Sequence, residues 1–372
     1  MPKPRNQGGQ FSRRNFIQTS AVGVAALAAP AIATAQKSDS NPTVGSGEHQ
    51  YEVLHAWPQL PAKFSWQTTH NVAIDSEGLL YVIHEGRADQ AEHPAIFVFD
   101  ADGKYIRSFG SDFQGGGHGI EIRNEGGQDF IYVAAYQAVR SFAKLDLKGE
   151  LLWRKGAPMD AGGYAEGEEH TSHAKATWGR DRFQPTNFAF HPDGGFFLAD
   201  GYGSYRIHRY DQDANWISTF GEVGTEDSQF RLPHGLWIDG RGDGEPLLVV
   251  SDRVNARLQW FTLAGKHVRT QGDFLLPANN DVLGDLMVVP DLVGRVTLLD
   301  KDNQVLAHLG DDSARIQADQ KEYNTFHIRG DESTWLPGKF IHPHDACFDV
   351  SGNIFVAEWV GTGRVTKLRK LS

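Results

Sequence analysis

Three segments of this chain share one pattern, in which a histidine after glycine or proline opens an alternating apolar run. The histidines are His118, His234 and His344, and they are separated by 116 and 110 residues. If one structural repeat is roughly 40–55 residues long, these histidines fall on every second repeat. In a closed ring of six repeats, every second unit lies a third of a turn from the next. The three imidazoles would then converge on the axis, where they could bind a divalent metal ion.

Three histidine ligands would leave one coordination position of Zn²⁺ open, as in catalytic zinc sites. Another divalent transition metal would fit the same ligands. The chain has no CxxC or HExxH motif, so the prediction depends on the phase of the repeats. The alternative is that these are ordinary core or solvated residues among the 16 histidines of the chain. His70 has the same phase in the first repeat. It is either a fourth residue of the central channel or a capping side chain.

Three further residues have side chains suited to chemistry near such an ion. Asp345 would point to the opposite side of its strand from His344, and it is either a calcium ligand or a hydrogen-bonded structural aspartate. Tyr202 and Arg253 lie in turns after the second strand of the third and fourth repeats. If these turns face the histidines, the tyrosine could act as a general base. The arginine could bind a carboxylate with two hydrogen bonds.

The elements that would position these residues are short alternating strands separated by Asp-Gly and similar turns. Such strands predict antiparallel hairpins, and their recurrence predicts an all-β, six-bladed β-propeller with four-stranded blades. The last repeat has only about three strands, so residues 51–57 would supply the fourth and close the ring. Two polar inserts, at about residues 157–182 and 312–339, would lie on one face and could cover a site.

Four arginines recur before an apolar residue in different repeats. Because they recur, we expect them to make structural hydrogen bonds between blades. They are Arg206, Arg257, Arg295 and Arg364.

The first 35 residues are predicted to be a twin-arginine signal peptide. A pair of arginines precedes an apolar run and an Ala-Thr-Ala cleavage site. The run is too short and too rich in alanine for a stable membrane span, although an uncleaved anchor is the alternative. Residues 36–49 are expected to be a linker and residues 50–372 the propeller. The predicted location is therefore the periplasm or the medium.

The charge of the chain narrows the classes of partner. The formal net charge is −11, and removal of a leader with four basic and no acidic residues would make it −15. Such a charge argues against nucleic acid and against anionic membranes as partners. The chain has one cysteine, so no internal disulfide can form.

The repeats resemble those of the NHL-repeat propellers, and specifically the peptidyl-α-hydroxyglycine α-amidating lyases. The resemblance covers most of the propeller and is densest over residues 184–371. The segments around the three histidines resemble the zinc-binding segments of that family. Residues 199–207 resemble the segment with its catalytic tyrosine, which corresponds to Tyr202 here. Residues 251–259 resemble the segment with its active-site arginine, which corresponds to Arg253.

The resemblance implies a zinc ion at the three histidines and a calcium ion nearby. In the family the calcium ligands are an aspartate, matching Asp345, and two backbone carbonyls, which would fall on Val72 and Ile120. The family also has an arginine directly after a histidine in its first blade. In this chain Glu85 follows His84 at that place. Arg87 could replace the arginine only if the turn is reshaped.

The function that the resemblance implies is an exported, metal-dependent lyase. It would cleave the C–N bond of a carbinolamide-like substrate to an amide and a carbonyl product such as glyoxylate. We expect a monomer that acts on a small molecule or a peptide. Two alternatives are open: a non-catalytic binding propeller with structural metals, and a calcium-dependent hydrolase of the lactonase type.

Overall fold

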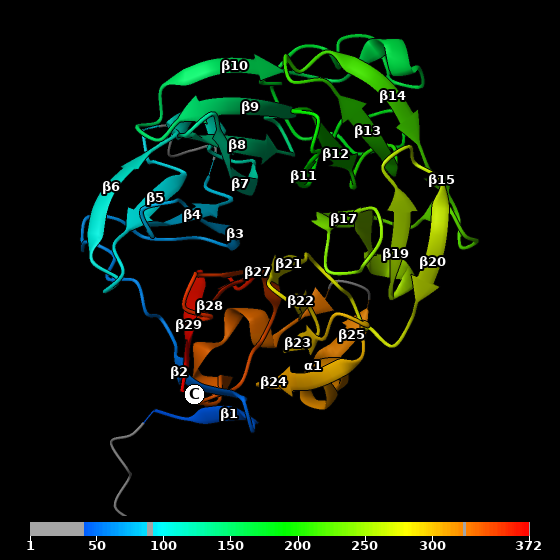
Figure 1. Cartoon of the computed structure of the whole chain (residues 1–372). Coiled ribbons are helices and arrows are strands. Elements are labelled where there is room, and N and C mark those ends of the chain that lie inside the picture. The colour runs from blue at the N-terminus through cyan, green and yellow to red at the C-terminus, as the bar shows by residue number, and fades with distance from the viewer. Residues whose placement is uncertain (1–40, 88–91, 323–324, 372) are drawn as a thin grey trace, which may run out of the picture. The chain divides into compact units, whose positions relative to one another are not determined.

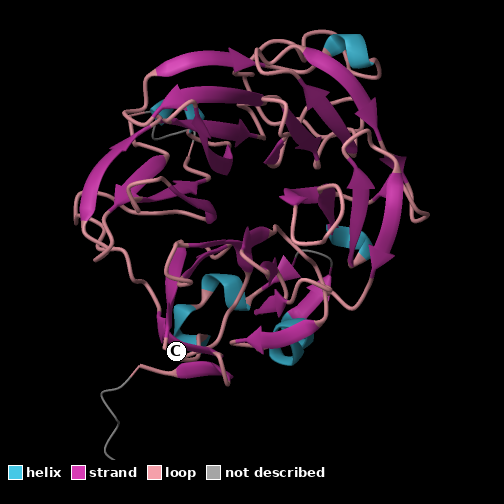
Figure 2. Ribbon diagram, viewed as in Figure 1, coloured by secondary structure: helices cyan, strands magenta, loops and turns pink. Residues whose placement is uncertain are grey.

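The computed structural model describes residues 41–87, 92–322 and 325–371. Within the unit that begins at Asn41, the strands form six large sheets that follow one another around a ring (Figure 1). Figure 2 shows that strands make up nearly all of the regular structure. In the described part of the chain α1 (Ser313–Asp319) is the one α-helix. The predicted all-β, six-bladed propeller is confirmed.

We name the sheets blades A to F, in the chain order of their innermost strands. Neighbouring strands within each blade are antiparallel. The bounds are β3 (Thr69–Ile74), β4 (Leu80–His84), β5 (Ile96–Phe99) and β6 (Tyr105–Phe109) in blade A; β7 (Gly117–Glu125), β8 (Gln128–Ala135), β9 (Ser141–Asp146) and β10 (Leu151–Lys155) in blade B; β11 (Phe188–Phe190), β12 (Phe196–Asp200), β13 (Arg206–Tyr210) and β14 (Trp216–Phe220) in blade C; β17 (Pro233–Asp239), β18 (Leu247–Asp252), β19 (Arg257–Thr262) and β20 (His267–Gln271) in blade D; β21 (Asp281–Leu283), β22 (Leu286–Asp291), β23 (Arg295–Leu299) and β24 (Val305–Leu309) in blade E; and β27 (Pro343–Phe348), β28 (Ile354–Glu358) and β29 (Arg364–Lys370) in blade F.

The ring is closed by a strand from the start of the described chain. β2 (His49–Leu54) pairs with β29, so that Tyr51 lies opposite Lys370. This confirms the predicted closure. β1 (Thr43–Ser46) adds a fifth strand to blade F. These residues fall in the segment expected to be a linker, so the folded unit begins earlier than residue 50. The reason is that a four-residue strand gives little sequence pattern.

The apolar core lies between neighbouring blades. Alternate residues of one strand pack toward opposite neighbours: in β8, Ile131 and Val133 join the cluster shared with blade A, whereas Tyr132 and Ala134 join the cluster shared with blade C. Similar clusters join the other neighbouring pairs. Because each blade is held on both faces, the inner strands are fixed where they meet the axis.

The remaining short elements lie in the segments that join the blades, except for the turn at residues 253–255, which lies between β18 and β19 of blade D. They are β15 (Glu222–Val223), β16 (Gln229–Phe230), β25 (Gln320–Glu322), β26 (Thr325–Phe326) and the 3₁₀ turns Ser111–Phe113, Met159–Ala161, Arg253–Asn255, Ile328–Gly330 and Glu332–Thr334. No helix among the described residues is both long and apolar enough to span a bilayer. The predicted signal peptide lies outside the described residues.

Candidate metal centre

Four histidines occupy equivalent positions at the start of inner strands. His70, His118, His234 and His344 lie in β3, β7, β17 and β27. At each of them the strand pairing is interrupted by a register shift, as in a β-bulge. Bulges at the rim of a sheet redirect a side chain. The same backbone irregularity therefore turns all four imidazoles in an equivalent direction.

The four rings lie against one another at the axis. The ring centroids of His118 and His344 are 5.0 Å apart. His234 lies 4.8 Å from the first of these rings and 4.7 Å from the second. His70 lies 4.8 Å and 4.6 Å from the same two rings. All four side chains are buried. The structure thus brings together the three predicted ligands and the fourth candidate.

Three of the histidines are anchored in the same way by the next blade around the ring. Each donates a hydrogen bond from Nδ1 to a backbone carbonyl at the equivalent position of its neighbour. The pairs are His118 to Thr186 (3.0 Å), His234 to Ala278 (2.6 Å) and His344 to His70 (2.7 Å). A carbonyl oxygen can only accept, so Nδ1 carries the proton and the lone pair of the neutral ring is on Nε2.

The glycines after two of these histidines allow this close approach between blades. A Cβ atom at Gly119 would lie 2.3 Å from the carbonyl oxygen of Thr186, and one at Gly235 would lie 2.3 Å from Cα of Asn279. Any larger residue would push the neighbouring strand away. The His-Gly step in the sequence therefore has a structural reason.

The lone pairs of two rings face each other. Nε2 of His118 and Nε2 of His234 are 3.1 Å apart, and both atoms are acceptors because the proton of each ring is on Nδ1. Two acceptors at this distance repel unless a cation lies between them. Two nitrogen ligands about 2.1 Å from one metal ion are about 3.0–3.4 Å apart, depending on the angle. The observed distance fits a shared metal ion.

Burial keeps these rings neutral, which is the state that binds a metal. Burial is the main cause that lowers the pKa of each of the four histidines, and Arg253 lowers it further. Neighbouring imidazoles add to the effect at His118, His234 and His344, whereas Glu85 opposes it at His70. The ligand nitrogens of His70, His118 and His344 lie within 4.8 Å of one another, a grouping that could hold a metal ion. This grouping differs from the predicted triad, because His70 takes the place of His234 in it.

Tyr202 and Arg253 border the histidines, as expected if the turns that carry them face the axis. The Tyr202 hydroxyl is 3.3 Å from Nε2 of His234, and it accepts a hydrogen bond of 3.2 Å from Nη1 of Arg253. The Arg253 side chain is buried, yet its Nε and Nη2 have no hydrogen-bond partner among the described residues. Buried, unpaired N–H donors beside these histidines favour an anionic ligand.

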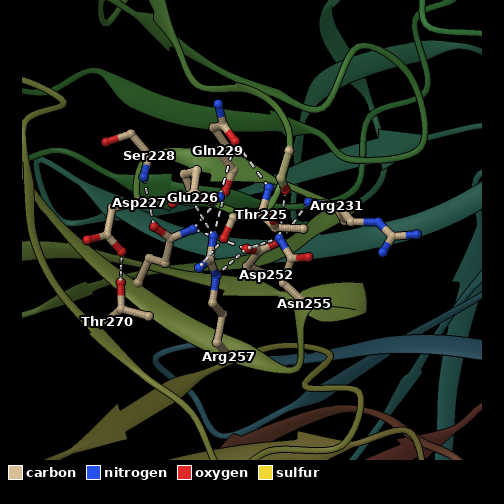
Figure 3. Close-up of polar contacts among 12 residues, drawn as sticks. Thr225, Glu226, Asp227, Ser228, Gln229, Arg231, Asp252, Asn255, Arg257 and Thr270 are labelled. Carbon is tan, nitrogen blue, oxygen red and sulfur yellow. Dashed lines mark hydrogen bonds and ion pairs between the residues drawn. The ribbon is translucent and has the colours of Figure 1, made fainter.

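The turn that carries Arg253 is held by a polar network behind it (Figure 3). Asp252 accepts hydrogen bonds from the backbone N–H of Arg231 (2.8 Å) and from Nδ2 of Asn255 (2.7 Å). It also forms an ion pair of 2.7 Å with Arg257, one of the four recurring arginines. This network fixes the backbone on both sides of Arg253.

The recurring arginines make the structural contacts expected of them. Each donates to a backbone carbonyl of the segment that precedes its blade or follows the previous one. The bonds are Arg206 to Gly162, Arg257 to Thr225, Arg295 to Asp273 and Arg364 to Lys339.

Both polar inserts contribute residues beside the centre. Trp178, from the first insert, is 57% exposed and lies edge-on to Tyr136 and Tyr202, with centroid distances of 6.1 Å. Arg329, from the second insert, donates to the Thr68 hydroxyl at 2.6 Å. Burial lowers the pKa of Arg329, and the negative charge of Glu85 opposes this shift. The centre is therefore bordered by an aromatic side chain and a second guanidinium.

Two residues that the sequence offered as additional candidates do not join the centre. Both ring nitrogens of His84 are used by the backbone, at Gln67 (3.2 Å) and Pro94 (2.9 Å). Arg87 is exposed, and its backbone N–H donates to Gln114. His84 directly precedes Glu85 in the sequence, and alternation along the strand turns its ring to the opposite side from the Glu85 side chain.

Behind the histidines lies a cluster of buried carboxyl groups that the sequence analysis largely missed. Glu121, Asp281 and Asp345 line a cavity of about 250 Å³ together with Asn279 and Asn280. The Oδ1 atoms of these two asparagines are buried without a hydrogen-bond partner in the described structure. Burial is the main cause that raises the pKa of Glu121 well above its ordinary value, and repulsion from Asp345 and Asp281 raises it further. Unpaired oxygens of this kind favour a hard cation such as Ca²⁺.

Two of the predicted calcium ligands, Asp345 and Val72, line this cavity. The backbone N–H of Val72 donates to Oδ2 of Asp345 at 2.8 Å, and the other carboxylate oxygen accepts from Asn279 at 2.5 Å. The side chain of Ile120 is buried in the apolar cluster between blades A and B, and the side chain of the next residue, Glu121, faces the cavity. Calcium binding by the carbonyl oxygens of Val72 and Ile120 stays a prediction.

These carboxyl groups predict that the cation-free protein loses stability as the pH rises. Burial raises the pKa of Asp281 and of Asp345 to about 7, from an ordinary value of 3.8. The folded protein therefore holds these protons more tightly than the unfolded chain does, and raising the pH from about 4 to about 7 favours unfolding. Bound Ca²⁺ reverses the effect because it stabilises the ionised carboxylates.

Thermal unfolding tests this prediction. In calcium-free buffer the Tm should fall by several degrees between pH 5 and pH 8, and Ca²⁺ should raise it far more at pH 8 than at pH 5. Asp345→Asn should lose most of the response to calcium. A Tm that rises over this range without calcium, and does not respond to calcium, would contradict the assignment.

Comparison with known proteins finds similarity to amidating enzymes over most of the chain. No family model matches. The chain is 28% identical over 349 residues to peptidyl-alpha-hydroxyglycine alpha-amidating lyase 1 of Drosophila melanogaster, covering 83% of this chain and 58% of that protein. It is 25% identical over 333 residues to peptidyl-glycine alpha-amidating monooxygenase B of Xenopus laevis, covering 81% of this chain and 34% of that protein. The chain thus spans less than two thirds of these relatives.

Solved structures with similar folds include proteins named for different reactions. Virginiamycin B lyase from Staphylococcus aureus has a TM-score of 0.52 at 12% identity and covers 86% of this chain and all of its own. A gluconolactonase from Xanthomonas campestris has a TM-score of 0.55 at 14% identity and covers 89% of this chain and 95% of its own. At these identities the likeness establishes the fold alone.

Proposed function

We propose that this protein is an exported, metal-dependent lyase of the amidating-lyase type. It would cleave the C–N bond of an N-acyl-α-hydroxyglycine or a related carbinolamide, giving a primary amide and glyoxylate or a similar carbonyl product. The observation that carries the proposal is the pair of facing acceptor nitrogens, on His118 and His234, directly beside the Tyr202 hydroxyl. The similarity to two kinds of amidating enzyme supports the same reaction.

The metal ion, Zn²⁺ or another divalent transition metal, would be held through Nε2 of His118, His234 and His344. When bound, it supplies a positive charge that lowers the pKa of a substrate hydroxyl. Calcium at Asp345 and Glu121 would stabilise the strands that carry the histidines. The arginine pair in the leader supports export by the twin-arginine route, and we expect a monomer that acts on a small molecule or peptide.

Tyr202 would be the general base. Burial raises its pKa and the adjacent Arg253 opposes this shift, so a second cation nearby is needed before the phenol ionises readily. The ionised oxygen takes the proton of the substrate hydroxyl as the C–N bond breaks. The O–H electron pair becomes part of the new carbonyl, and the C–N pair stays on the amide nitrogen. That nitrogen receives the proton back from Tyr202, so atoms and charges balance.

Arg253 would bind the substrate carboxylate with its two unpaired N–H groups. A hydrogen bond to a charged group contributes about 1.5–3 kcal/mol, so Arg253→Ala should raise KM for a carboxylate substrate by roughly 10- to 100-fold. Arg253→Lys should recover only part of this loss, because lysine lacks the planar pair of donors. An ester of the same substrate should be nearly insensitive to either change. Equal effects on acid and ester would contradict the role.

A turnover assay on the mature protein tests the proposed reaction. Metal-free protein is loaded with Ca²⁺ and, in separate samples, with Zn²⁺ or another divalent transition metal, and release of amide and glyoxylate from an N-acyl-α-hydroxyglycine is followed. Release that depends on the transition metal supports the proposal. Metal-loaded protein that is inert on hydroxyglycine and hydroxyacid compounds would favour a binding propeller with structural metals.

One observation favours a second candidate. A calcium-dependent lactonase needs an axial site rich in oxygen ligands, and Glu121, Asn279, Asp281 and Asp345 provide one. Lactone hydrolysis that survives loss of the histidines but not of these carboxylates would support this hydrolase in place of the lyase.

A further inference from the structure

His70 shares the geometry of the three proposed ligands. It lies at the same register shift, in the inner strand of blade A. The rings of His118 and His344 form the middle of the cluster, because both contact His70 and His234. His70 and His234 therefore flank the same central pair.

The anchoring of His70 is reversed with respect to the other three. Its Nε2, rather than its Nδ1, is hydrogen-bonded, at 3.3 Å from Oε2 of Glu85. Its Nδ1 is buried and has no hydrogen-bond partner among the described residues. A carboxylate can only accept, so the proton of the neutral ring lies on Nε2 and the lone pair lies on Nδ1. All four rings thus have one nitrogen anchored by an acceptor and a lone pair on the other nitrogen.

Glu85 is itself held in place. Its Oε1 accepts from Nε2 of Gln137 at 2.6 Å, and its Oε2 accepts from the Tyr136 hydroxyl at 3.1 Å. Burial opposes ionisation of Glu85, but the hydrogen bonds from His70, Gln137 and Tyr136 outweigh it and lower its pKa to about 2. A carboxylate that orients the distal nitrogen of a histidine is the usual outer partner of a metal ligand.

We propose that His70 is a fourth nitrogen ligand of the metal ion, binding through Nδ1 and positioned by the Glu85 carboxylate. This inference rests on the metal site of the proposed function and adds one ligand to it. A capping role does not explain the arrangement, because a buried capping histidine would use both ring nitrogens in hydrogen bonds, as His84 does.

A fourth imidazole changes the class of metal that the site suits. Four ligands fill a tetrahedral zinc site and leave no position for substrate. An ion that also binds substrate must then accept five or six ligands, which favours Fe²⁺, Co²⁺, Ni²⁺ or Cu²⁺ over four-coordinate Zn²⁺. Glu85→Gln should weaken the binding of such an ion by roughly 10- to 100-fold, the usual effect of removing an outer carboxylate.

Co²⁺ titrated alone into the metal-free, full mature protein tests this inference. X-ray absorption counts the coordinated imidazoles, and visible absorption separates a tetrahedral ion, with intense bands, from a five- or six-coordinate ion, with weak ones. We expect four imidazoles and weak bands in the wild type, and three imidazoles with stronger bands in His70→Gln. His84→Gln serves as the matched control, because it alters a buried histidine of the same blade outside the cluster.

Two results would overturn the inference: an unchanged imidazole count and Co²⁺ affinity in His70→Gln, or an unchanged affinity in Glu85→Gln. Circular dichroism must first show that each variant folds. If His70→Gln does not fold, the wild-type imidazole count and the affinity of Glu85→Gln still decide. These outcomes are distinguishable from failure of the proposed lyase function. A protein with four coordinated imidazoles but no turnover would support His70 as a ligand and refute the lyase reaction. Turnover by a protein with three coordinated imidazoles would support the reaction and refute His70 as a ligand.

Discussion

Replacing His118 by alanine should remove the transition metal and nearly all turnover. His118 contacts both flanking histidines, His70 and His234, and its Nε2 is the atom that faces another acceptor at 3.1 Å. Removing it takes one ligand from the predicted triad and one from the grouping of His70, His118 and His344. Loss of a metal ion that supplies several kcal/mol of transition-state stabilisation corresponds to a rate loss on the order of 10³-fold or more. Elemental analysis of the purified variant gives the metal content, and the turnover assay gives the rate.

The control is His191→Ala. His191 lies in the turn between the first two strands of blade C and pairs with Asp193. This variant should keep both metal and activity. A His118→Ala protein that is folded and still binds a stoichiometric transition metal would show that the ion lies elsewhere.

The second large effect is expected for Tyr202→Phe. The hydroxyl of Tyr202 contacts His234 and Arg253, and in the proposed mechanism it carries the proton from oxygen to nitrogen. General base catalysis contributes roughly 10²–10⁴-fold, so kcat should fall by about that factor. The metal content should not change, because the ring still packs against the histidines and the phenol is not a ligand.

Two measurements separate this role from a structural one. The activity of the wild type should rise with pH through one ionisation. This rise should be missing from the residual activity of Tyr202→Phe. Tyr210→Phe is the matched control, since Tyr210 is a buried tyrosine of the same blade that lies outside the histidine cluster. Loss of the transition metal from Tyr202→Phe would refute the assignment of Tyr202 as the base.

The fold could be predicted because it follows from repetition. Alternating strands and turn residues recur in each blade, and the inter-blade clusters use this alternation directly. The phase of His118, His234 and His344 could be predicted for the same reason. The short strand β1 was missed because four residues give no recognisable pattern.

The parts of the site that repetition does not cover could not be predicted. Glu85 reaches His70 from the end of another strand, and its partners Tyr136 and Gln137 come from the next blade. No spacing in the sequence brings these residues together, because the contact depends on how two blades pack. Two features of the sequence nevertheless pointed to this contact. His70 has the same phase as the other three histidines, and Glu85 stands where the resembling family has an arginine.

The oxygen-rich cluster was missed for a related reason. Glu121 and Asp281 lie on different blades, yet both face the same cavity as Asp345. In the sequence each is an isolated acidic residue beside an apolar strand, which is far more often a solvated side chain. Only the closed ring makes the inward-facing positions of opposite blades neighbours.

The central claim is that imidazoles from alternate blades share one cation, and anomalous diffraction from crystals of the mature protein tests it most directly. Data collected on both sides of the absorption edge of the metal should give one strong peak in the anomalous difference map. This peak should lie within bonding distance of Nε2 of His118, His234 and His344. A map with no peak among these rings, from protein that elemental analysis shows to contain the metal, would contradict the account.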